Sequence, residues 1–184
     1  MMRQPNDDLA ALVRTIPDYP KLGIQFRDIT TLLLDGEGLA ATIERLAAAV
    51  APPGGSPPAL IAAIEARGFI FGAALAVRFG CGLVLLRKKN KLPGRVIGVN
   101  YALEYGQDRI EMHADAVTPG ARVLLVDDLI ATGGTALAGV ELLRGAGAVV
   151  SEAAFAIGLP ALGGPDRMRA TGVAVTTLID FDGH

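Results

Sequence analysis

The stretch VLLVDDLIATGGT (residues 123–135) places two adjacent acids and a loop of small residues directly after an apolar run. Short continuous apolar runs are typical of strands buried in a parallel sheet, and ligands bind at the carboxyl ends of such strands. We therefore expect Asp127 and Asp128 to lie at the end of a buried strand. Ionised carboxylates only accept hydrogen bonds, so this pair suits a vicinal diol such as that of ribose.

The loop that follows the acids is suited to bind a phosphate. It consists of Ala131, Thr132, Gly133, Gly134 and Thr135, and it opens a predicted helix. Its glycines allow consecutive backbone N–H groups to line a concave surface, and a helix N-terminus favours an anion. The alternative is an ordinary strand, turn and helix with an acid as the helix cap. Neither GxxxxGK[ST] nor GxGxxG fits this loop.

Outward from this stretch, the chain alternates between expected strands and helices. Strands are predicted at residues 59–65, 81–87, 121–128, 148–160 and 172–180, helices at residues 7–16, 38–50, 68–80 and after the glycine pair, and a hairpin within residues 96–117. This alternation indicates an α/β fold with a mostly parallel central sheet flanked by helices. His113 is interpreted as a strand residue and Cys81 as a core residue.

Composition and charge exclude several classes of protein. The 184 residues, 51% hydrophobic and 20% charged, suffice for the core of one domain. A net charge of −2 gives no electrostatic footprint for nucleic acid. We expect no membrane span and no signal peptide, and the single cysteine, Cys81, favours a reducing cytoplasm. Cys81, His113 and His184 lack the spacing of zinc ligands.

The stretch at residues 123–135 resembles the phosphoribosyl diphosphate (PRPP) binding signature of type I phosphoribosyltransferases. The resemblance implies that Asp127 and Asp128 hold the ribose hydroxyls and that the loop after them cradles the 5′-phosphate. It also implies a single domain over residues 1–184, with a small N-terminal hood at about residues 1–35 and a mobile flap hairpin at about residues 87–113.

Further stretches resemble the adenine phosphoribosyltransferases in particular: PDYPKLGIQFRDITTLL (residues 17–33), EARGFIFG (65–72), RKKNKLPG (87–94) and YALEYG (101–106). The resemblance implies that Arg67, Arg87 and Lys91 contact the diphosphate, some of them from the neighbouring subunit of a homodimer. A guanidinium forks well onto phosphate oxygens. The alternative for Arg67 is a surface ion pair. The alternative for Arg87 and Lys91 is a solvated basic face of the protein. Some relatives carry Asp-Ser in place of Glu65-Ala66, with a peptide bond that is sometimes cis.

The identity of the base is indicated by Ala131. Related enzymes that act on 6-oxopurines typically carry an acid at this position, beside purine N7, and an alanine cannot transfer a proton. By resemblance, Glu104 assists at N7 of adenine as the bond to ribose C1 forms, and Tyr105 helps to close the flap. Acid–base assistance of this kind is worth about 10²–10⁴-fold. The alternatives are that Glu104 is a solvated residue of the hairpin and that Tyr105 is a half-exposed aromatic residue there.

The resemblance also implies an apolar slot for adenine. Phe26 would stack on one face of the base, Leu159 would pack on the other, and the backbone of Gln25 and Arg27 would read its edge. Adenine presents an acceptor at N1 and a donor at its amino group, whereas a 6-oxopurine presents the reverse and would leave buried polar groups unpaired. Phe26 and Leu159 as ordinary core residues are the alternative.

The reaction implied by the resemblance is purine salvage, in which adenine and PRPP give AMP and diphosphate. Mg²⁺ keeps several waters and binds phosphate oxygens, so we expect the substrate to hold it and no dedicated metal site. The rivals are a 6-oxopurine phosphoribosyltransferase and a non-catalytic regulator that senses PRPP. The net charge and the lack of spare length count against the regulator. A plain ribose-phosphate-binding module leaves Arg67 and Lys91 unexplained.

Overall fold

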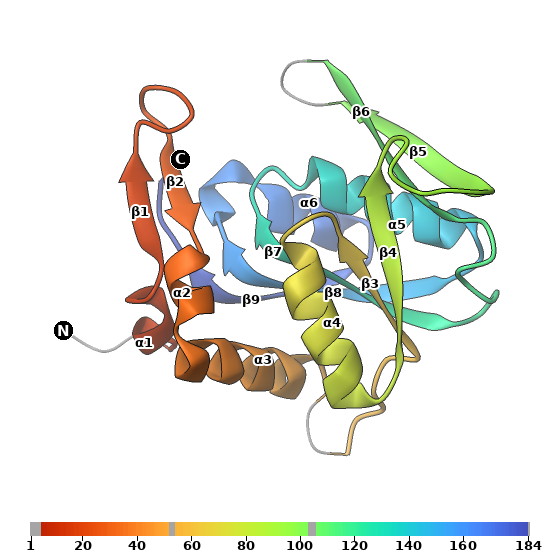
Figure 1. The fold of residues 1–184 in the computed structure, drawn as a ribbon, viewed down its shortest axis with the longest axis horizontal. Helices are drawn as coiled ribbons and strands as arrows, with labels where there is room; N and C mark the ends of the chain where they lie inside the picture. The colour runs from red at the N-terminus through yellow and green to blue at the C-terminus, as the bar shows by residue number, and fades with distance from the viewer. Residues whose placement is uncertain (1–4, 52–53, 103–105, 184) are drawn as a thin grey trace.

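A computed structural model describes residues 5–51, 54–102 and 106–183, which form one large and one small sheet with helices around them (Figure 1). The strands are β1 (Arg14–Pro17), β2 (Gln25–Asp28), β3 (Leu60–Ile64), β4 (Gly82–Lys88), β5 (Val96–Ala102), β6 (Gln107–His113), β7 (Arg122–Ile130), β8 (Val149–Gly158) and β9 (Ala174–Asp180). The helices are α1 (Asp7–Ala10), α2 (Thr30–Leu34), α3 (Gly36–Val50), α4 (Gly68–Phe79), α5 (Gly134–Gly145) and α6 (Gly164–Ala170), with a short 3₁₀ helix, η1 (Pro160–Leu162).

The large sheet has the strand order β5-β6-β4-β3-β7-β8-β9. Strands β4, β3, β7, β8 and β9 are parallel to one another, and the β5–β6 hairpin adds two antiparallel strands at one edge, where β6 pairs with β4. The prediction of an α/β fold with a mostly parallel sheet is therefore confirmed. The crossovers bring the carboxyl ends of β3 and β7 to the same edge, where the polar loops of the candidate site lie.

Two apolar clusters fill the faces of the sheet, because successive side chains of a strand point to opposite faces. In β7, Leu125 belongs to the cluster that includes Leu143 of α5. Leu124, one residue earlier, belongs to the cluster that includes Leu46 of α3 and Leu75 of α4. Helices thus cover both faces, and the near-continuous apolar run of β7 is explained by burial on both sides.

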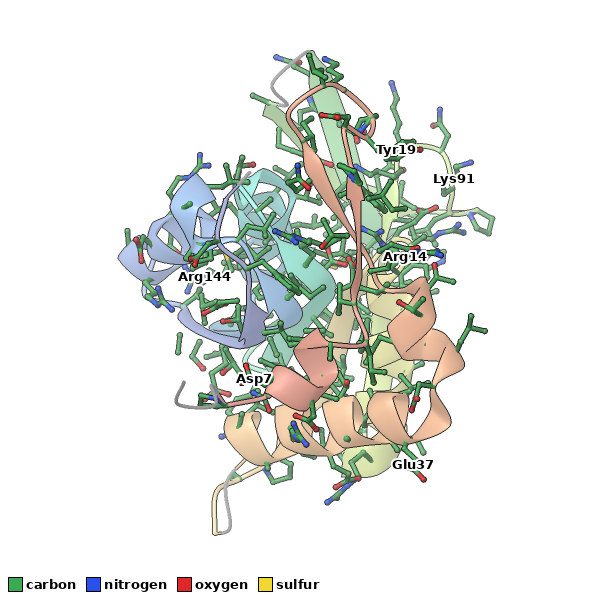
Figure 2. The ribbon with its side chains drawn as sticks, turned by 90° about the vertical axis from the view of Figure 1, so that its left-hand side faces the viewer. Asp7, Arg14, Tyr19, Glu37, Lys91 and Arg144 are labelled. Carbon is green, nitrogen blue, oxygen red and sulfur yellow. The ribbon has the colours of Figure 1, made fainter. Side chains whose placement is uncertain are left out.

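The N-terminal segment differs from its predicted structure. Helix α1 ends at Ala10, and β1 and β2 pair as an antiparallel hairpin in a sheet of their own, so the prediction of a helix over residues 7–16 is wrong beyond Ala10. The β-branched Thr15 and Ile16 favour a strand, and they pair with Arg27 and Phe26. Figure 2 shows this hairpin from the side, with Arg14 low on it and Tyr19 toward its turn.

Asp28 joins the hairpin to the helix that follows it. Its carboxylate accepts hydrogen bonds from the hydroxyl and the backbone N–H of Thr30, at 2.6 and 2.9 Å, and from Arg14 Nε at 3.1 Å. The Thr30 hydroxyl, together with Arg14 and the Thr30 N–H, lowers the pKa of Asp28 to about 2. The ionised form of Asp28 therefore stabilises the entry into α2.

The other predicted elements are present within a few residues of their expected bounds. The helix at residues 38–50 is α3, the helix at residues 68–80 is α4, and the hairpin is β5–β6. His113 is the last residue of β6, as expected, and Cys81 is half-buried beside the core, where burial raises the pKa of its thiol. Helices α2 and α6 were not predicted. Within the described ranges, every helix is too short or too polar to cross a membrane.

Candidate active site

The two acids of the opening stretch lie inside β7, not at its end. Strand β7 continues to Ile130 because β8 goes on pairing with it there, so the prediction that Asp127 and Asp128 end the strand is wrong. The pairing with β3, on the other side, stops at Val126. The acids therefore lie just past the carboxyl end of β3, where the sheet leaves one side of β7 without a neighbouring strand.

The acid pair is buried and is balanced by one arginine. The Asp128 side chain is only 7% exposed, and its Oδ2 lies 2.7 Å from Arg67 Nε. That oxygen accepts no well-directed hydrogen bond from any residue the structure describes. Burial raises the pKa of both carboxyls, the charge of Asp128 raises that of Asp127 further, and the Arg67 charge opposes the rise at Asp128. The pair therefore favours hydroxyl donors or positive charge beside it.

The small-residue loop forms a concave surface at the start of α5. Gly133 has a φ of 80°, the left-handed conformation that favours glycine, and it caps the helix. A hollow of about 140 Å³ is lined by Asp127, Leu129, Ile130, Ala131, Thr132, Gly133, Gly134, Thr135 and Ala136. The structure thus brings one of the two acids and all five loop residues to one hollow, of a size that suits a phosphate group.

Gly164, at the start of α6, supports this loop from outside. Its N–H donates a hydrogen bond to Ala131 O at 3.0 Å. A Cβ added to Gly164 would lie 2.2 Å from that oxygen and 2.8 Å from Gly133 N, so only glycine allows this approach. Sequence reasoning missed Gly164. The Gly163-Gly164 pair is a local turn signal, but nothing in it identifies a contact more than 30 positions away.

Arg67 lies between the acid pair and the N-terminal hairpin. It precedes α4, and its guanidinium carbon lies 5.6 Å from the centre of the Phe26 ring. The Phe26 ring in turn meets Tyr19 edge to face, at 5.2 Å between ring centres. A hollow of about 460 Å³ is lined by Ile16, Tyr19, Phe26, Asp28, Ile29, Thr30, Leu33 and Arg67. Arg67 does form an ion pair, as the alternative interpretation expected, but its partner Asp128 is a buried residue of the candidate site.

The other residues expected around a base lie on two elements. Gln25 and Arg27 flank Phe26 on β2 and are partly exposed. Leu159 follows β8, is 7% exposed in the cluster of α3 and α4, and donates its N–H to Ile130 O at 2.9 Å. Phe26 therefore faces a hollow, whereas Leu159 has the surroundings of a core residue next to the strand that carries the acids.

The basic run that begins in the last two residues of β4 is tied to the end of β3. Arg87 Nε lies 3.1 Å from Glu65 Oε2, and Arg87 Nη1 donates to Lys91 O at 2.8 Å. Burial by itself raises the pKa of Glu65, but Arg87 and the N–H of Lys88 outweigh it, so the pKa lies below its ordinary value. The Glu65–Ala66 peptide bond is cis, and the Lys91 side chain is exposed. Arg87 and Lys91 thus lie beside the edge that carries Arg67.

Two expected catalytic residues, Glu104 and Tyr105, lie outside the described residues.

The flanking strands β5 and β6 are linked to β4 by an interaction that sequence reasoning missed. The Lys88 ammonium on β4 is bonded to the Asp108 carboxylate and lies 2.5 Å from the Tyr101 hydroxyl. Burial lowers the pKa of Lys88, but these two partners outweigh it and the pKa is raised.

Known proteins resemble this chain over most of its length. The model of the phosphoribosyl transferase domain matches residues 30–182. An adenine phosphoribosyltransferase of Sphingopyxis alaskensis is 58% identical over 98% of this chain and 96% of its own length.

Solved structures of adenine phosphoribosyltransferases are also similar. That of Thermoanaerobacter pseudethanolicus superposes with a TM-score of 0.88 at 45% identity, over 95% of this chain and 99% of that one. That of Saccharomyces cerevisiae, in complex with an imino-altritol bisphosphate and adenine, gives 0.85 at 33% identity over 93% and 96%.

Proposed function

The chain belongs to the adenine phosphoribosyltransferase family, and we propose that it transfers the 5-phosphoribosyl group of PRPP to adenine, giving AMP and diphosphate in purine salvage. The observation that carries the proposal is the hollow at the start of α5, where Asp127 and the loop at residues 131–135 meet, next to the Arg67–Asp128 pair. This arrangement offers acceptors for a ribose diol, a cradle for a phosphate and a cation for a diphosphate.

In this reaction the bond from adenine to ribose C1 forms as the bond from C1 to diphosphate breaks. Asp127 and Asp128 hold the ribose hydroxyls, the loop at residues 131–135 binds the 5′-phosphate, and Arg67 contacts the diphosphate. The Arg67–Asp128 ion pair, at 2.7 Å, supports this division because it puts both functions within reach of one sugar diphosphate. Arg87 and Lys91 add positive charge at the same edge.

Mg²⁺ belongs to this proposal as a partner of the substrate. The buried carboxylates of Asp127 and Asp128 fit that role, because Mg²⁺ prefers oxygen ligands and burial of this pair favours positive charge beside it. The ion would be held mainly by PRPP oxygens, near Asp127 and Asp128, and when bound it supplies positive charge to the departing diphosphate.

The base is adenine rather than a 6-oxopurine. Phe26 stacks on it, Leu159 packs on the opposite side, and the backbone of Gln25 and Arg27 reads its edge. The hollow beside Phe26 supports the first of these roles. Ala131 offers no proton to a 6-oxopurine N7, and Glu104 takes the corresponding role for adenine, with Tyr105 closing the flap over the site. Exclusion of water by the flap protects the reactive sugar from hydrolysis.

The active form is a cytoplasmic homodimer in this proposal. Apolar side chains remain exposed on α4 and on the neighbouring strand β4: Ile70 (40%), Val77 (84%), Leu83 (36%) and Leu85 (38%). A patch of this kind marks an interaction surface. The patch includes part of β4, the strand that carries Arg87, so a second subunit bound there supports the sharing of the basic residues between two sites.

The test is to incubate the purified protein with Mg²⁺, PRPP and adenine, hypoxanthine, guanine or xanthine in turn, and to quantify diphosphate and nucleotide. We expect AMP from adenine alone and a loss of about 10²-fold or more in kcat for Glu104→Ala. Glu141→Ala, on the exposed side of α5, is a matched control that leaves the rate unchanged.

Each other outcome has a definite meaning. Turnover of a 6-oxopurine in place of adenine contradicts the reading of Ala131. Tight binding of PRPP without turnover of any base contradicts the assignment as an enzyme and supports a regulator that senses PRPP.

A further inference from the structure

The segment that follows β9 lies against the N-terminal hairpin. In Figure 1 the C-terminal end of the chain runs beside β2, although the two segments are far apart in sequence. Phe181 is half-buried there and packs against the cluster that includes α3 and α4. The adenine-binding role proposed for β2 does not account for this contact.

The contact is made by the side chain of Arg27. Its guanidinium carbon lies 4.3 Å from the centre of the Phe181 ring, and its Nη2 donates to Asp182 O at 3.2 Å. Its Nη1 donates to Thr15 Oγ1 on β1 at 2.5 Å. Within the described part of the chain, Arg27 Nε is buried and has no hydrogen-bond partner. The guanidinium is therefore held by the Phe181 ring in addition to two hydrogen bonds.

The same segment also contacts the opposite side of the proposed adenine slot. The N–H of Phe181 donates to Gly158 O at 3.0 Å, next to Leu159. Leu159 and Phe181 belong to the same apolar cluster. Phe181 therefore contacts both sides of the proposed slot. Its ring meets Arg27, which lies next to Phe26 on β2, and its backbone N–H bonds to Gly158, which precedes Leu159.

We propose that Phe181 is a positioning residue for the base: stacked on the Arg27 guanidinium and bonded to Gly158, it sets the spacing between the two walls of the adenine slot. The inference rests on the proposed function, because it takes adenine as the base between Phe26 and Leu159. Dispersion contacts weaken sharply when a gap of even 0.5–1 Å opens. Loss of the Phe181 ring therefore weakens adenine binding without changing the PRPP site.

The experiment compares Phe181→Leu, Phe181→Tyr and Arg27→Met with the wild-type chain, each with adenine and PRPP varied separately. Phe79→Leu is the matched control, since Phe79 is also half-buried in the same cluster but lies at the end of α4 away from Arg67. Thermal unfolding of each variant reports any general loss of stability.

For Phe181→Leu we expect the KM for adenine to rise about fivefold, which corresponds to about 1 kcal/mol, with the KM for PRPP unchanged. Phe181→Tyr keeps the ring face and restores the wild-type value. Arg27→Met raises the KM for adenine to a similar extent, and the double variant adds little, because both changes remove one interaction. Phe79→Leu lowers stability but leaves both KM values unchanged.

An unchanged KM for adenine in both Phe181→Leu and Arg27→Met overturns the inference, as does an equal rise for both substrates or the same rise in Phe79→Leu. If Phe181→Leu does not fold, Arg27→Met alone decides the test. The Arg27 side chain is partly exposed, so its replacement disturbs the core less than a change at Phe181. The proposed function is tested separately by the wild type: if wild-type protein does not use adenine, that proposal fails, whatever the variants do.

Discussion

Replacing Gly164 by alanine tests whether the start of α6 holds in place the loop at residues 131–135, which is proposed to bind phosphate. The added Cβ would lie 2.2 Å from Ala131 O, whereas real Cβ atoms essentially never approach a neighbour within 3.0 Å. The loop or the helix must therefore move by at least 0.8 Å. Neither can yield cheaply, because the atoms that Cβ would meet, Ala131 O and Gly133 N, belong to the backbone.

A displacement of this size at a substrate-positioning loop is large for an enzyme. A misplacement of about 1 Å can lower a rate by about 10²-fold, so we expect kcat/KM for PRPP to fall about 10²-fold in Gly164→Ala. Overpacking also lowers stability by about 1–3 kcal/mol, and activity should be measured well below the unfolding temperature.

The assay is steady-state formation of AMP with PRPP varied at saturating adenine, accompanied by thermal unfolding. Gly145→Ala is the matched control, since a Cβ there meets no atom within 4 Å and its backbone conformation is ordinary. We expect this control to keep wild-type kinetics. A Gly164→Ala enzyme that is folded and within twofold of the wild-type kcat/KM for PRPP would refute the reasoning.

Two further predictions concern charged side chains. Arg67→Met should lower kcat/KM for PRPP by about 10- to 100-fold, because charge-assisted hydrogen bonds contribute about 1.5–3 kcal/mol. It should also move the acidic limb of the pH–rate profile to higher pH, since the Arg67 charge holds down the pKa of Asp128; an unshifted limb contradicts that pairing. The pKa of Asp28 is lowered in the folded chain, so its contribution to stability is present above the ordinary value and is lost as pH falls toward about 2. Between pH 5 and pH 2 we expect the unfolding temperature of the wild type to fall further than that of Asp28→Asn. Because Arg14 is half-exposed, the difference should be about 1 kcal/mol, or roughly 2–4 °C. Equal falls in the two proteins would disprove the prediction.

The order of strands and helices could be predicted because apolar runs and helical spacing are local signals. The N-terminal segment could not, since residues 7–16 carry a weak helical pattern, whereas Thr15 and Ile16 find strand partners in β2. The length of β7 was also beyond local reasoning. Whether a strand stops at Val126 or continues to Ile130 depends on which neighbour remains to pair with it, and that neighbour is β8.

The candidate site was predicted at the level of residue types rather than of contacts. The two acids and the glycine-containing loop that follows β7 are close together in sequence, so their proximity in the structure could be predicted from one stretch of chain. The pairing of Arg67 with Asp128 and the support of the loop by Gly164 join different elements. Contacts of that kind depend on how the helices pack, which no local pattern specifies.

The contact between Arg27 and Asp182 has a consequence for the order in which the molecule folds. The two residues lie 155 positions apart, so this contact closes a very long loop, whereas the strand, loop and helix proposed to bind phosphate are neighbours in the chain. Non-local contacts of this kind form slowly, because the entropy of loop closure is lost before the contact is gained. We therefore expect the loop at residues 131–135 and helix α5 to form before the contact between Arg27 and Asp182, which joins the N-terminal hairpin to the end of the chain. A chain arrested before that contact forms would retain the loop proposed for the 5′-phosphate and lack the contact that holds the side chain of Arg27 in the proposed site for the base.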